Sequence, residues 1–394
     1  MHLYDFYNYW RNFAGNFTTL PQYFKENNYQ TISLGKVFHP GKSSNYTDDY
    51  PFSWSITPWH PSSEEFMNEP VCIDIKTGLL QNNLLCPLDI NLQPEATLPD
   101  IQTTLEAKKY LKKLNNSTKP FFLAVGYHKP HIPFRFPFKY LNYHPIRKFR
   151  WPEGNYVPYD LPNVAFNPYN DIRNRDDMKK INISYPFGPI PRDTAALIRQ
   201  HYYASITYVD DLIGHLIKSV DLNSTIIVLT ADHGWSLGEH AEWSKYSNYE
   251  MALRVPLIFY SPTFQLDKSI KMYDIVELVD LFPTLVELGN LPLLKSCKNK
   301  KHKLLCTEGK SLVNLMKKNY KKNFNAKIEE SVAYSQYPRP GSYPGFYPDS
   351  DKPKLKQIKI MGYTLRTKQF RYTLWIEFNS TNFKKRMYHD SVIR

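Results

Sequence analysis

Residues 225–245 decide the fold, and they read TIIVLTADHGWSLGEHAEWSK. The four apolar residues at 226–229 are mostly β-branched, a pattern typical of a buried strand in a mostly parallel sheet. Asp232 and His233 follow this strand, and Gly234 lets the backbone turn sharply there. Open α/β sheets place their ligand sites beyond the carboxyl ends of their strands. Lys245 could reach back over the same crevice, so the stretch predicts a metal site that handles an anion.

A purely structural interpretation is equally well supported by these residues alone. In that interpretation Asp232 caps the following helix, and His233 is a histidine whose nitrogens are satisfied inside the protein. A lone Lys245 is then a surface lysine in an ion pair.

The rest of the chain alternates strand and helix patterns, which favours an α/β fold with a largely parallel sheet. We expect strands at 31–34, 121–125, 225–230 and 255–260, and helices at 103–114, 193–220 and 273–288. The first helix has apolar Leu105, Leu111 and Leu114 among lysines, and Asp193 is a plausible cap of the second. The second helix has one apolar face, made of Leu197, Ile198, Ile206, Val209, Leu212, Ile213, Leu216 and Ile217. Residues 135–191 are rich in Pro, Tyr and Asn, and predict a long irregular excursion over the surface.

The pattern changes after a lysine-rich linker at 317–327. Residues 358–365 and 370–378 predict an antiparallel hairpin. Its buried side is expected to carry Tyr372, Leu374, Ile376 and Phe378. We therefore expect a large domain at 1–325 and a smaller α+β carboxyl-terminal subdomain at 326–394.

Bulk composition limits the functional classes. The chain has 394 residues and a formal net charge of +13, and no run approaches the roughly 20 apolar residues that a membrane helix needs. A basic chain attracts nucleic acids, anionic membranes or sulfated sugars. Many lysines fall in loops such as 295–303 and no nucleic-acid fold signature accompanies them, so we interpret most of the charge as compositional bias and expect no nucleic-acid partner.

Cysteines and sequons indicate the compartment. The four cysteines, Cys72, Cys86, Cys297 and Cys306, form two local pairs, although four cysteines allow three connectivities. Zinc binding is disfavoured, because no C-x-x-C spacing is present. N-x-[ST] sequons occur at Asn16, Asn45, Asn115, Asn116, Asn182, Asn223 and Asn379. Together these features favour a secretory or lysosomal route, yet the opening MHLYDF is no signal peptide, so we expect a cytosolic chain or a missing amino terminus.

Several blocks of the sequence resemble the sulfatases of the alkaline-phosphatase-like superfamily. They are TADHGWSLGEHAEWSKYSN (230–248) with RVPLIFY (254–260), GNFTTLPQYFKENNYQTISLGKVFHPG (15–41), PFFLAVGYHKPHIPFRFP (120–137), DLFPTLVELG (280–289), AYSQYPRP (333–340) and KIMGYTLRT (359–367). The blocks lie in the family's order and span nearly the whole chain. The resemblance implies an alkaline-phosphatase-like α/β fold, with a mostly parallel sheet flanked by helices and a smaller antiparallel carboxyl-terminal subdomain.

Four residues are implied to contact the sulfate. Sulfate-ester hydrolysis needs a nucleophile, a divalent cation, further cations for the spreading negative charge and an acid for the departing alcohol. By resemblance, Lys36 and His39 line the sulfate pocket. His131, the last histidine of HKPH, is the expected proton donor or sulfate contact, and Lys245 is a further sulfate cation. As an isolated K-x-x-H pattern, Lys36 and His39 would instead be a solvated lysine and a turn histidine.

The resemblance also implies a cofactor, sugar contacts and disulfides. Asp232 and His233 are the expected metal residues, and Ca²⁺ is the family's usual ion. The expected sugar-binding residues are Trp235, Tyr246, Lys352, Tyr4 and Asp5. The implied disulfides are Cys72–Cys86 and Cys297–Cys306, and the implied glycosylation sites are Asn16, Asn45, Asn116, Asn182 and Asn223.

The sequence departs from the family at the nucleophile. Sulfatases make a formylglycine from a cysteine in C-x-[PA]-x-R, and none of the four cysteines stands in that motif. The family's first strand, with its adjacent aspartates, has no counterpart either, because the match begins at Met1. We therefore expect a chain that lacks its amino-terminal part and hydrolyses sulfate esters negligibly by itself.

The implied activity is removal of the 2-sulfate from terminal iduronate of heparan and dermatan sulfate, by a monomeric lysosomal or secreted sulfuric ester hydrolase. One alternative is a non-catalytic protein that binds sulfated glycans. Another is a metal-dependent phosphatase or phosphodiesterase of the same superfamily, which would need a Thr or Ser nucleophile and more His and Asp ligands.

Overall fold

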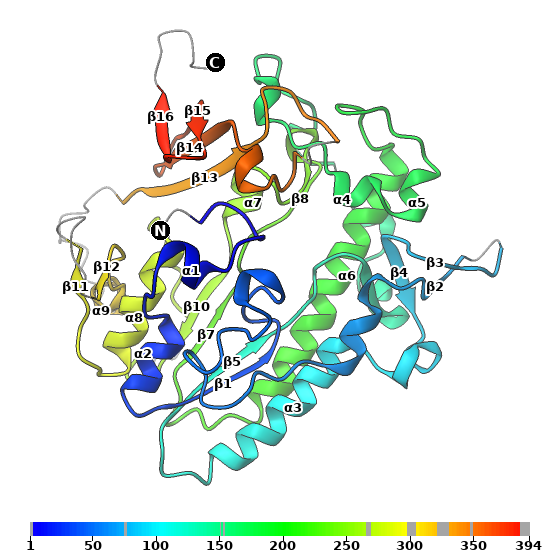
Figure 1. The fold of residues 1–394 in the computed structure, drawn as a ribbon. Coiled ribbons are helices and arrows are strands. Elements are labelled where there is room, and N and C mark those ends of the chain that lie inside the picture. Colours follow the sequence, from blue (N-terminus) through cyan, green and yellow to red (C-terminus); the bar gives the residue numbers. More distant parts are fainter. Residues whose placement is uncertain are drawn as a thin grey trace.

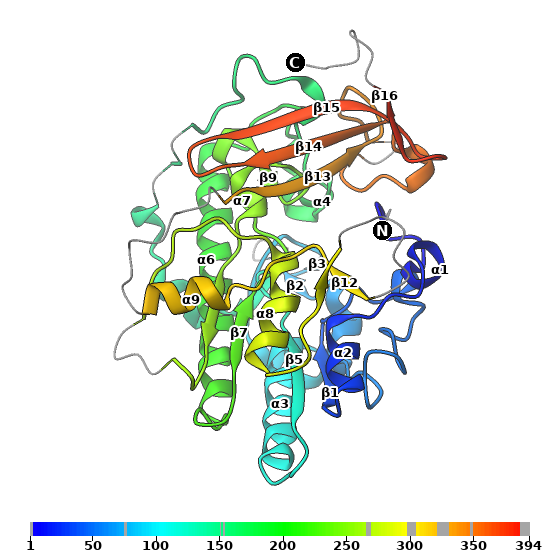
Figure 2. The ribbon, with the colours of Figure 1, turned by 90° about the vertical axis from the view of Figure 1, so that its left-hand side faces the viewer.

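The computed structural model describes residues 3–74, 77–149, 151–152, 154–264, 269–297, 305–320, 331–346 and 350–386. The central strands lie between two groups of helices, with α2 and α8 on one side and α3 and α6 on the other (Figure 1). A separate antiparallel sheet lies beyond one end of the central strands (Figure 2). This arrangement confirms the predicted α/β fold with a smaller carboxyl-terminal sheet.

The helices are α1 (Trp10–Ala14), α2 (Leu20–Glu26), α3 (Pro99–Leu114), α4 (Asn170–Arg173), α5 (Asp176–Lys179), α6 (Arg192–Ile217), α7 (Glu250–Leu253), α8 (Leu281–Leu288) and α9 (Val313–Tyr320). The strands are β1 (Gln30–Gly35), β2 (Cys72–Ile73), β3 (Leu80–Gln81), β4 (Leu85–Leu88), β5 (Phe121–Gly126), β6 (Phe134–Pro137), β7 (Ile227–Thr230), β8 (Ser236–Leu237), β9 (Trp243–Ser244), β10 (Leu257–Tyr260), β11 (Lys295–Ser296), β12 (Cys306–Thr307), β13 (Ala333–Arg339), β14 (Ile360–Arg366), β15 (Arg371–Asn379) and β16 (Lys384–Arg386).

The four predicted central strands are all present. β1 and β5 pair in parallel, in register from Gln30 opposite Phe121 to Gly35 opposite Gly126. β7 pairs antiparallel with β10 and, among the described strands, with no other. The expectation that residues 226–229 form a buried strand was therefore wrong in one respect. These residues are only half-buried, because β7 has a strand neighbour on one side alone.

The two long helices differ from the sequence prediction in where they begin and in which side chains they bury. α3 starts at Pro99, and its buried side includes Ala107, Leu111 and Leu114, whereas Leu105 is 54% exposed. The cap of α6 is the backbone at Pro191, so Asp193 is a first-turn residue and not the cap. An acidic residue in the first turn still stabilises the helix through its dipole. Within the predicted apolar face of α6, Ile206 and Ile217 are exposed.

The helix expected at 273–288 is much shorter. Residues 273–277 are not helical, and α8 begins at Leu281 after one turn of 3-10 helix at Leu278–Asp280. The side chains of Glu277 and Asp280 form a capping box that starts the helix there. The first part of the expected 317–327 linker belongs to α9, and residues 321–327 lie outside the described part of the chain.

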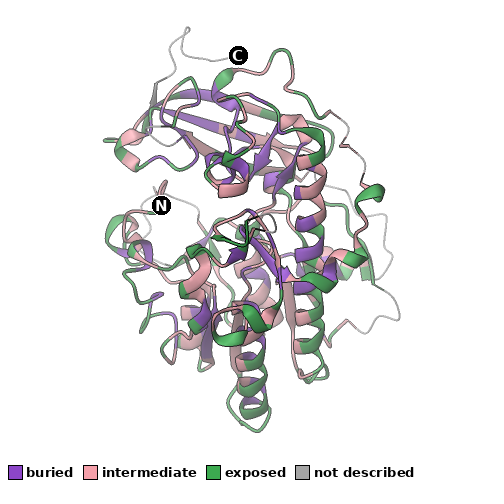
Figure 3. Ribbon diagram, turned by 90° about the vertical axis from the view of Figure 1, so that its right-hand side faces the viewer, coloured by how far each residue is buried: buried purple, intermediate pink, exposed green. Residues whose placement is uncertain are grey.

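Residues 135–191 were expected to run over the surface, and this expectation was wrong. They contain little regular structure, but their aromatic and aliphatic side chains help to build the largest core cluster. Phe136, Phe166, Tyr169 and Ile172 are almost completely buried there against α6 residues such as Ile198. Figure 3 shows buried segments in the central strands, in parts of α6 and in the carboxyl-terminal sheet.

The carboxyl-terminal sheet has the order β13–β14–β15–β16, with antiparallel neighbours. The hairpin β14–β15 was predicted, but its burial was not. Tyr372 is 63% exposed, while Trp375, Ile376 and Phe378 are all buried. Both faces are covered at that end, because Trp375 packs with Val164 on one side and Phe378 packs near Tyr4 on the other. The expected boundary between residues 325 and 326 lies outside the described residues, so it stays a prediction.

Candidate active site

Two neighbouring strand ends bring Lys36 close to the HKPH segment. Because β1 and β5 are parallel and in register, the residues after Gly35 and after Gly126 emerge side by side. The backbone N–H of Lys36 donates to the carbonyl of Gly126 at 3.0 Å. A Cβ on Gly126 would lie 1.9 Å from the Lys36 carbonyl oxygen. Only glycine at position 126 allows this close approach. The backbone of Lys36 is therefore held against the end of β5, the strand that leads to His131.

Gly234, which follows β7, allows close packing of the backbone and does not adopt a positive φ. The sequence suggested that it allows a sharp turn, but it is not among the positive-φ residues. A Cβ there would lie 2.0 Å from the carbonyl oxygen of Met251, and its N–H donates to the Ala252 carbonyl at 2.8 Å. The absence of a side chain thus lets the Asp232–His233 turn lie against α7.

Electrostatic interactions show that the implied sulfate residues lie near one another. Lys36 and Lys245 each lower the pKa of His39, of His131 and of His233, in each case alongside the larger effect of burial. Lys245 also interacts with Asp232. Residues that follow three separate strands therefore lie within electrostatic range of the same two lysines.

The three imidazoles have the same orientation relative to their own backbone. Nδ1 lies within hydrogen-bonding distance of the next residue's carbonyl oxygen, at 3.0 Å for His39, 2.6 Å for His131 and 2.8 Å for His233. A carbonyl oxygen can only accept, so Nδ1 must carry a proton in each ring. The neutral rings therefore have Nε2 as the unprotonated nitrogen, which can take up a proton.

Burial lowers the proton affinity of the basic groups in this region. Burial, and then the lysines, hold the pKa of His131 well below its usual value. Burial and the neighbouring Lys36 lower the pKa of Lys245 to about 8, and burial lowers that of Lys129 to about 7. Without an anion His131 is thus neutral near pH 7, and negative charge placed among these groups would raise their pKa values.

Asp171 is a partly buried acidic residue near Lys245 that the sequence did not indicate. Ser244 adopts a left-handed backbone at φ 70°, and its hydroxyl donates to Asp171 Oδ2 at 2.9 Å. This hydrogen bond stabilises the strained backbone of Ser244, the residue directly before Lys245. Burial raises the pKa of Asp171, whereas the charges of Lys245 and Lys352 lower it. Asp171 lies in the irregular region, where no periodicity marks it.

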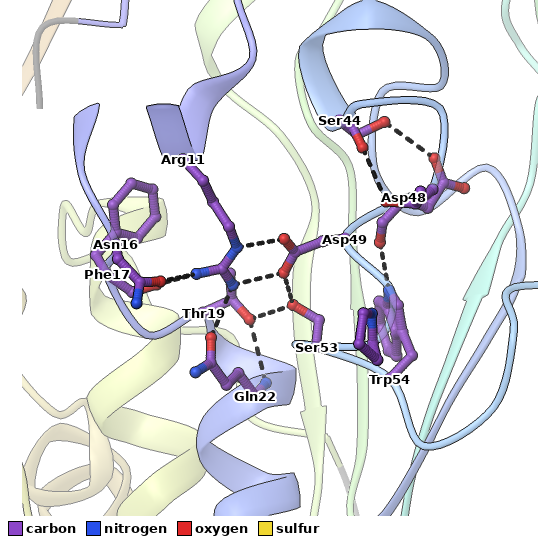
Figure 4. Close-up of polar contacts among 12 residues, drawn as sticks. Arg11, Asn16, Phe17, Thr19, Gln22, Ser44, Asp48, Asp49, Ser53 and Trp54 are labelled. Carbon is purple, nitrogen blue, oxygen red and sulfur yellow. Dashed lines mark hydrogen bonds and ion pairs between the residues drawn. The ribbon is translucent and has the colours of Figure 1, made fainter. Parts of the chain in front are cut away.

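A buried network fixes the segment that follows His39 (Figure 4). The guanidinium of Arg11 binds both carboxylate oxygens of Asp49 and donates to Asn16 Oδ1 and Gln22 Oε1, each at 2.7 Å. Ser53 also donates to Asp49. The side chains of Arg11 and Asp49 are 5% and 0% exposed. The ion pair therefore ties the amino-terminal segment to the loop that runs from the site.

The described residues do not by themselves form a calcium site. Asp232 has a 76% exposed side chain, whose Oδ1 accepts only its neighbour's N–H, from His233, at 3.0 Å. Calcium takes six to eight oxygen ligands, and no group of three His, Cys, Asp or Glu in the described ranges could hold a metal ion. The roles of Asp232 and His233 as metal residues therefore stay a prediction.

Two of the expected sugar contacts are in the protein interior. Trp235 is 7% exposed and packs against Phe134 and Tyr202 in the main core. Tyr246 is 8% exposed, and its ring lies 5.5 Å from Lys245 Nζ. The expected sugar-binding role of both rings stays a prediction, although little of either side chain is open to solvent.

The other expected sugar contacts lie at different places. The Tyr4 ring packs against Phe378. Asp5 accepts the backbone N–H groups of Tyr7 and Leu355, so its carboxylate holds the amino-terminal segment against the carboxyl-terminal part. Lys352 is exposed and interacts electrostatically with His39 and Lys245. Of the five residues, Lys352 has the position best suited to a charged substrate group.

Both expected disulfides are present, Cys72–Cys86 and Cys297–Cys306. All four cysteines are therefore oxidised, and none is free. The five expected glycosylation residues, Asn16, Asn45, Asn116, Asn182 and Asn223, are exposed. Among the described helices, none is both long and apolar enough to cross a membrane.

Comparison with known proteins identifies the family of this chain. The sulfatase family model matches residues 1–291. The chain is 47% identical over 412 residues to iduronate 2-sulfatase of Mus musculus, covering 97% of this chain and 74% of that protein. It is 48% identical over 420 residues to iduronate 2-sulfatase of Homo sapiens, with the same coverage. The solved phosphonate monoester hydrolase from Silicibacter pomeroyi shares the fold, with a TM-score of 0.59, 15% identity and coverage of 91% of this chain and 73% of that one. The chain belongs to the sulfatase family.

Proposed function

We propose that this chain recognises the 2-sulfate of terminal iduronate in heparan and dermatan sulfate, the substrate of a sulfuric ester hydrolase. The observation that carries the proposal is the set of interactions of Lys36 and Lys245 with three imidazoles. A sulfate ester has three equivalent non-bridging oxygens, and a cluster of cations around them balances their charge. The similarity to iduronate 2-sulfatases supports the choice of sugar.

The side chains of this region have distinct tasks in the proposal. Lys36 and Lys245 attract the anion and hold its oxygens. His131 is neutral before binding, takes up a proton at Nε2 when the anion raises its pKa, and then donates to a sulfate oxygen or to the departing alcohol. Lys352, on the exposed side, pairs with the uronate carboxylate.

The reaction also needs a nucleophile, and a polypeptide of this sequence has no cysteine that could supply one. None of the four cysteines stands in C-x-[PA]-x-R, and all four are in disulfides. We therefore propose that this polypeptide alone binds sulfated uronates but turns them over negligibly. The same observation favours a second candidate function, a non-catalytic sulfatase relative that binds sulfated glycans.

Localisation and modification follow from the same proposal. Two disulfides and the exposed sequon asparagines suit a lysosomal or secreted glycoprotein. The Asn16 carboxamide also accepts a hydrogen bond from Arg11, so a glycan there would extend from an anchored side chain.

Calorimetry with a disaccharide that ends in 2-O-sulfated iduronate, beside its desulfated counterpart, tests the proposal. We expect binding of the sulfated sugar only, and its loss in Lys36→Ala and Lys245→Ala. Lys109→Ala, which removes a 69% exposed lysine on α3, is the control and should bind like the wild type. Equal affinity for both sugars would overturn the proposal. Turnover well above background would overturn the claim of negligible activity and leave the recognition claim standing.

A further inference from the structure

A chain of alternating carboxylates and imidazoles, exposed in part at its middle, leads to the HKPH segment. Asp48 Oδ2 contacts His60 Nε2 at 2.6 Å, and His60 Nδ1 lies 3.3 Å from Glu64 Oε2. Glu64 Oε1 lies 3.0 Å from His128 Nε2, and His128 Nδ1 lies 3.5 Å from Asp100 Oδ1. The His60 side chain is 33% exposed, whereas that of Asp100 is 2% exposed. The Asp48 side chain at the other end is only 5% exposed, so the chain reaches solvent at its middle members, His60 and Glu64.

The inner end of this chain is bound to the backbone of the site. Asp100, in the first turn of α3, accepts the backbone N–H of His128 at 2.7 Å and that of Lys129 at 3.0 Å. The His131 N–H donates to the His128 carbonyl at 2.8 Å, and Lys129 Nζ donates to the His131 carbonyl at 2.7 Å. One buried carboxylate thus holds a tight loop whose last residue is His131.

The chain also separates two cavities. Asp48, His60 and Glu64 line a surface cavity of about 350 Å³. Glu64 also lines an inner cavity of about 40 Å³, together with Asp100, His128, Lys129 and His131. Glu64 is therefore the link between the solvent side and the space behind His131.

We propose that Asp100, His128 and Glu64 are positioning residues for the oxyanion site, because they hold the 128–131 loop so that His131 stays directed at the anion. The inference rests on the proposed function, since it assumes that the anion binds beside His131. Asp100 makes the backbone contacts, His128 Nδ1 faces Asp100 at 3.5 Å without a hydrogen bond, and Glu64 Oε1 lies within hydrogen-bonding distance of His128 Nε2. Other charged or titratable groups that interact with Asp100 and the loop are Lys129, Arg135, Arg175, Lys36, Tyr127 and Tyr208.

Positioning and plain electrostatics predict opposite results for the same variant. Asp100→Asn removes a negative charge near a cationic anion site, so electrostatics alone predicts tighter binding of inorganic sulfate. Positioning predicts weaker binding, because an amide cannot accept both backbone N–H groups as the carboxylate does. The sign of the change decides between the two.

The experiment measures inorganic sulfate affinity by calorimetry from pH 5.5 to 8, with the imidazole ¹⁵N shifts of His131. We expect about tenfold weaker binding in Asp100→Asn and about threefold in Glu64→Gln. We also expect His131 to lose its fixed Nδ1–H form in both variants. The control for Asp100→Asn is Asp280→Asn, because Asp280 is a buried carboxylate that also accepts two backbone N–H groups, at 2.9 and 2.8 Å. The control for Glu64→Gln is Glu250→Gln, which breaks the ion pairs of Glu250 with Arg366 and Arg371 of the carboxyl-terminal sheet.

Unchanged or tighter sulfate binding in Asp100→Asn, with the His131 shifts of the wild type, would overturn the inference. If that variant does not fold, Glu64→Gln decides, since its side chain is 20% exposed and the substitution keeps the shape. If the wild type itself does not bind sulfate, the proposed function fails, while the ¹⁵N shifts still show whether Asp100 and Glu64 fix His131.

Discussion

Replacing Lys245 with methionine should stabilise the protein while it destroys anion binding. The pKa of Lys245 is lowered from 10.5 to about 8, first by burial and then by Lys36. At about 1.4 kcal/mol per pKa unit, and allowing for partial exposure, keeping this lysine charged costs about 2–3 kcal/mol of folding free energy. Lys245→Met keeps most of the volume and removes that cost.

The pH dependence of this gain has a definite sign. Below pH 8 Lys245 is charged in both folded and unfolded chains, so the full cost is present. Between pH 8 and 10.5 the folded protein has released the proton that the unfolded chain still binds, so wild-type stability rises with pH and the advantage of Lys245→Met shrinks. Above 10.5 that advantage disappears.

Urea unfolding at pH 7 and pH 9.5, with inorganic sulfate calorimetry, measures both effects. We expect Lys245→Met to raise the free energy of unfolding by about 2–3 kcal/mol at pH 7, by clearly less at pH 9.5, and to abolish sulfate binding. Lys109→Met, at a 69% exposed lysine, should change stability by less than about 0.5 kcal/mol. A Lys245→Met protein that is no more stable than the wild type at pH 7 would refute the reasoning.

Three further predictions concern the surroundings of the site. Arg11→Met leaves the buried Asp49 carboxylate uncompensated and should lower the free energy of unfolding by about 3–5 kcal/mol, with partial recovery in Arg11→Met/Asp49→Asn; a loss under 1 kcal/mol in urea unfolding would contradict this. Hydrogen bonds to Asp48 and Glu64 raise the pKa of His60 to about 10. Burial raises the pKa of Glu64, but hydrogen bonds to His128 and His60 outweigh burial and lower it to about 2. The stability lost in His60→Gln should therefore be greatest between about pH 4.5 and 6.5, where His60 and Glu64 are ionised in the unfolded chain as well. The loss should fade as pH rises towards 10. Thermal unfolding at several pH values measures it, and a loss that does not change with pH would argue against the ion pair. Cys72→Ala/Cys86→Ala opens a bridge with a sequence separation of 14 and should cost about 3 kcal/mol, so an unchanged melting temperature would count against it.

Local sequence patterns were sufficient for the central strands and for part of the site. Residues 31–34 and 121–125 combine β-branched or aromatic residues with a following glycine, and they form β1 and β5 as expected. Lys36 and His131 were assigned through the family resemblance, and the parallel pairing of β1 and β5 places Lys36 against Gly126. Their roles in the site stay a prediction. Tyr273, Ile275 and Val276 extended the predicted helix too far towards its amino end, because the capping box at Glu277 and Asp280 determines where the helix starts.

Contacts between distant residues were beyond sequence reasoning. Asp171 is 73 residues from Ser244, and Asp100 is 28 residues from the His128 N–H that it holds, so no local spacing relates them. The burial of Trp235 was missed for another reason. An aromatic side chain near a site suits a sugar face and a protein core equally well, and only the packing against Phe134 and Tyr202 decides.

A crystal soaked in tungstate, with anomalous scattering recorded from tungsten, tests most directly whether the strand-end residues form one anion site. Tungstate is a tetrahedral oxyanion like sulfate. The account predicts one strong peak within hydrogen-bonding distance of Lys36 Nζ, Lys245 Nζ and His131 Nε2. Peaks elsewhere with none at this place, or these three atoms too far apart to reach one anion, would contradict it.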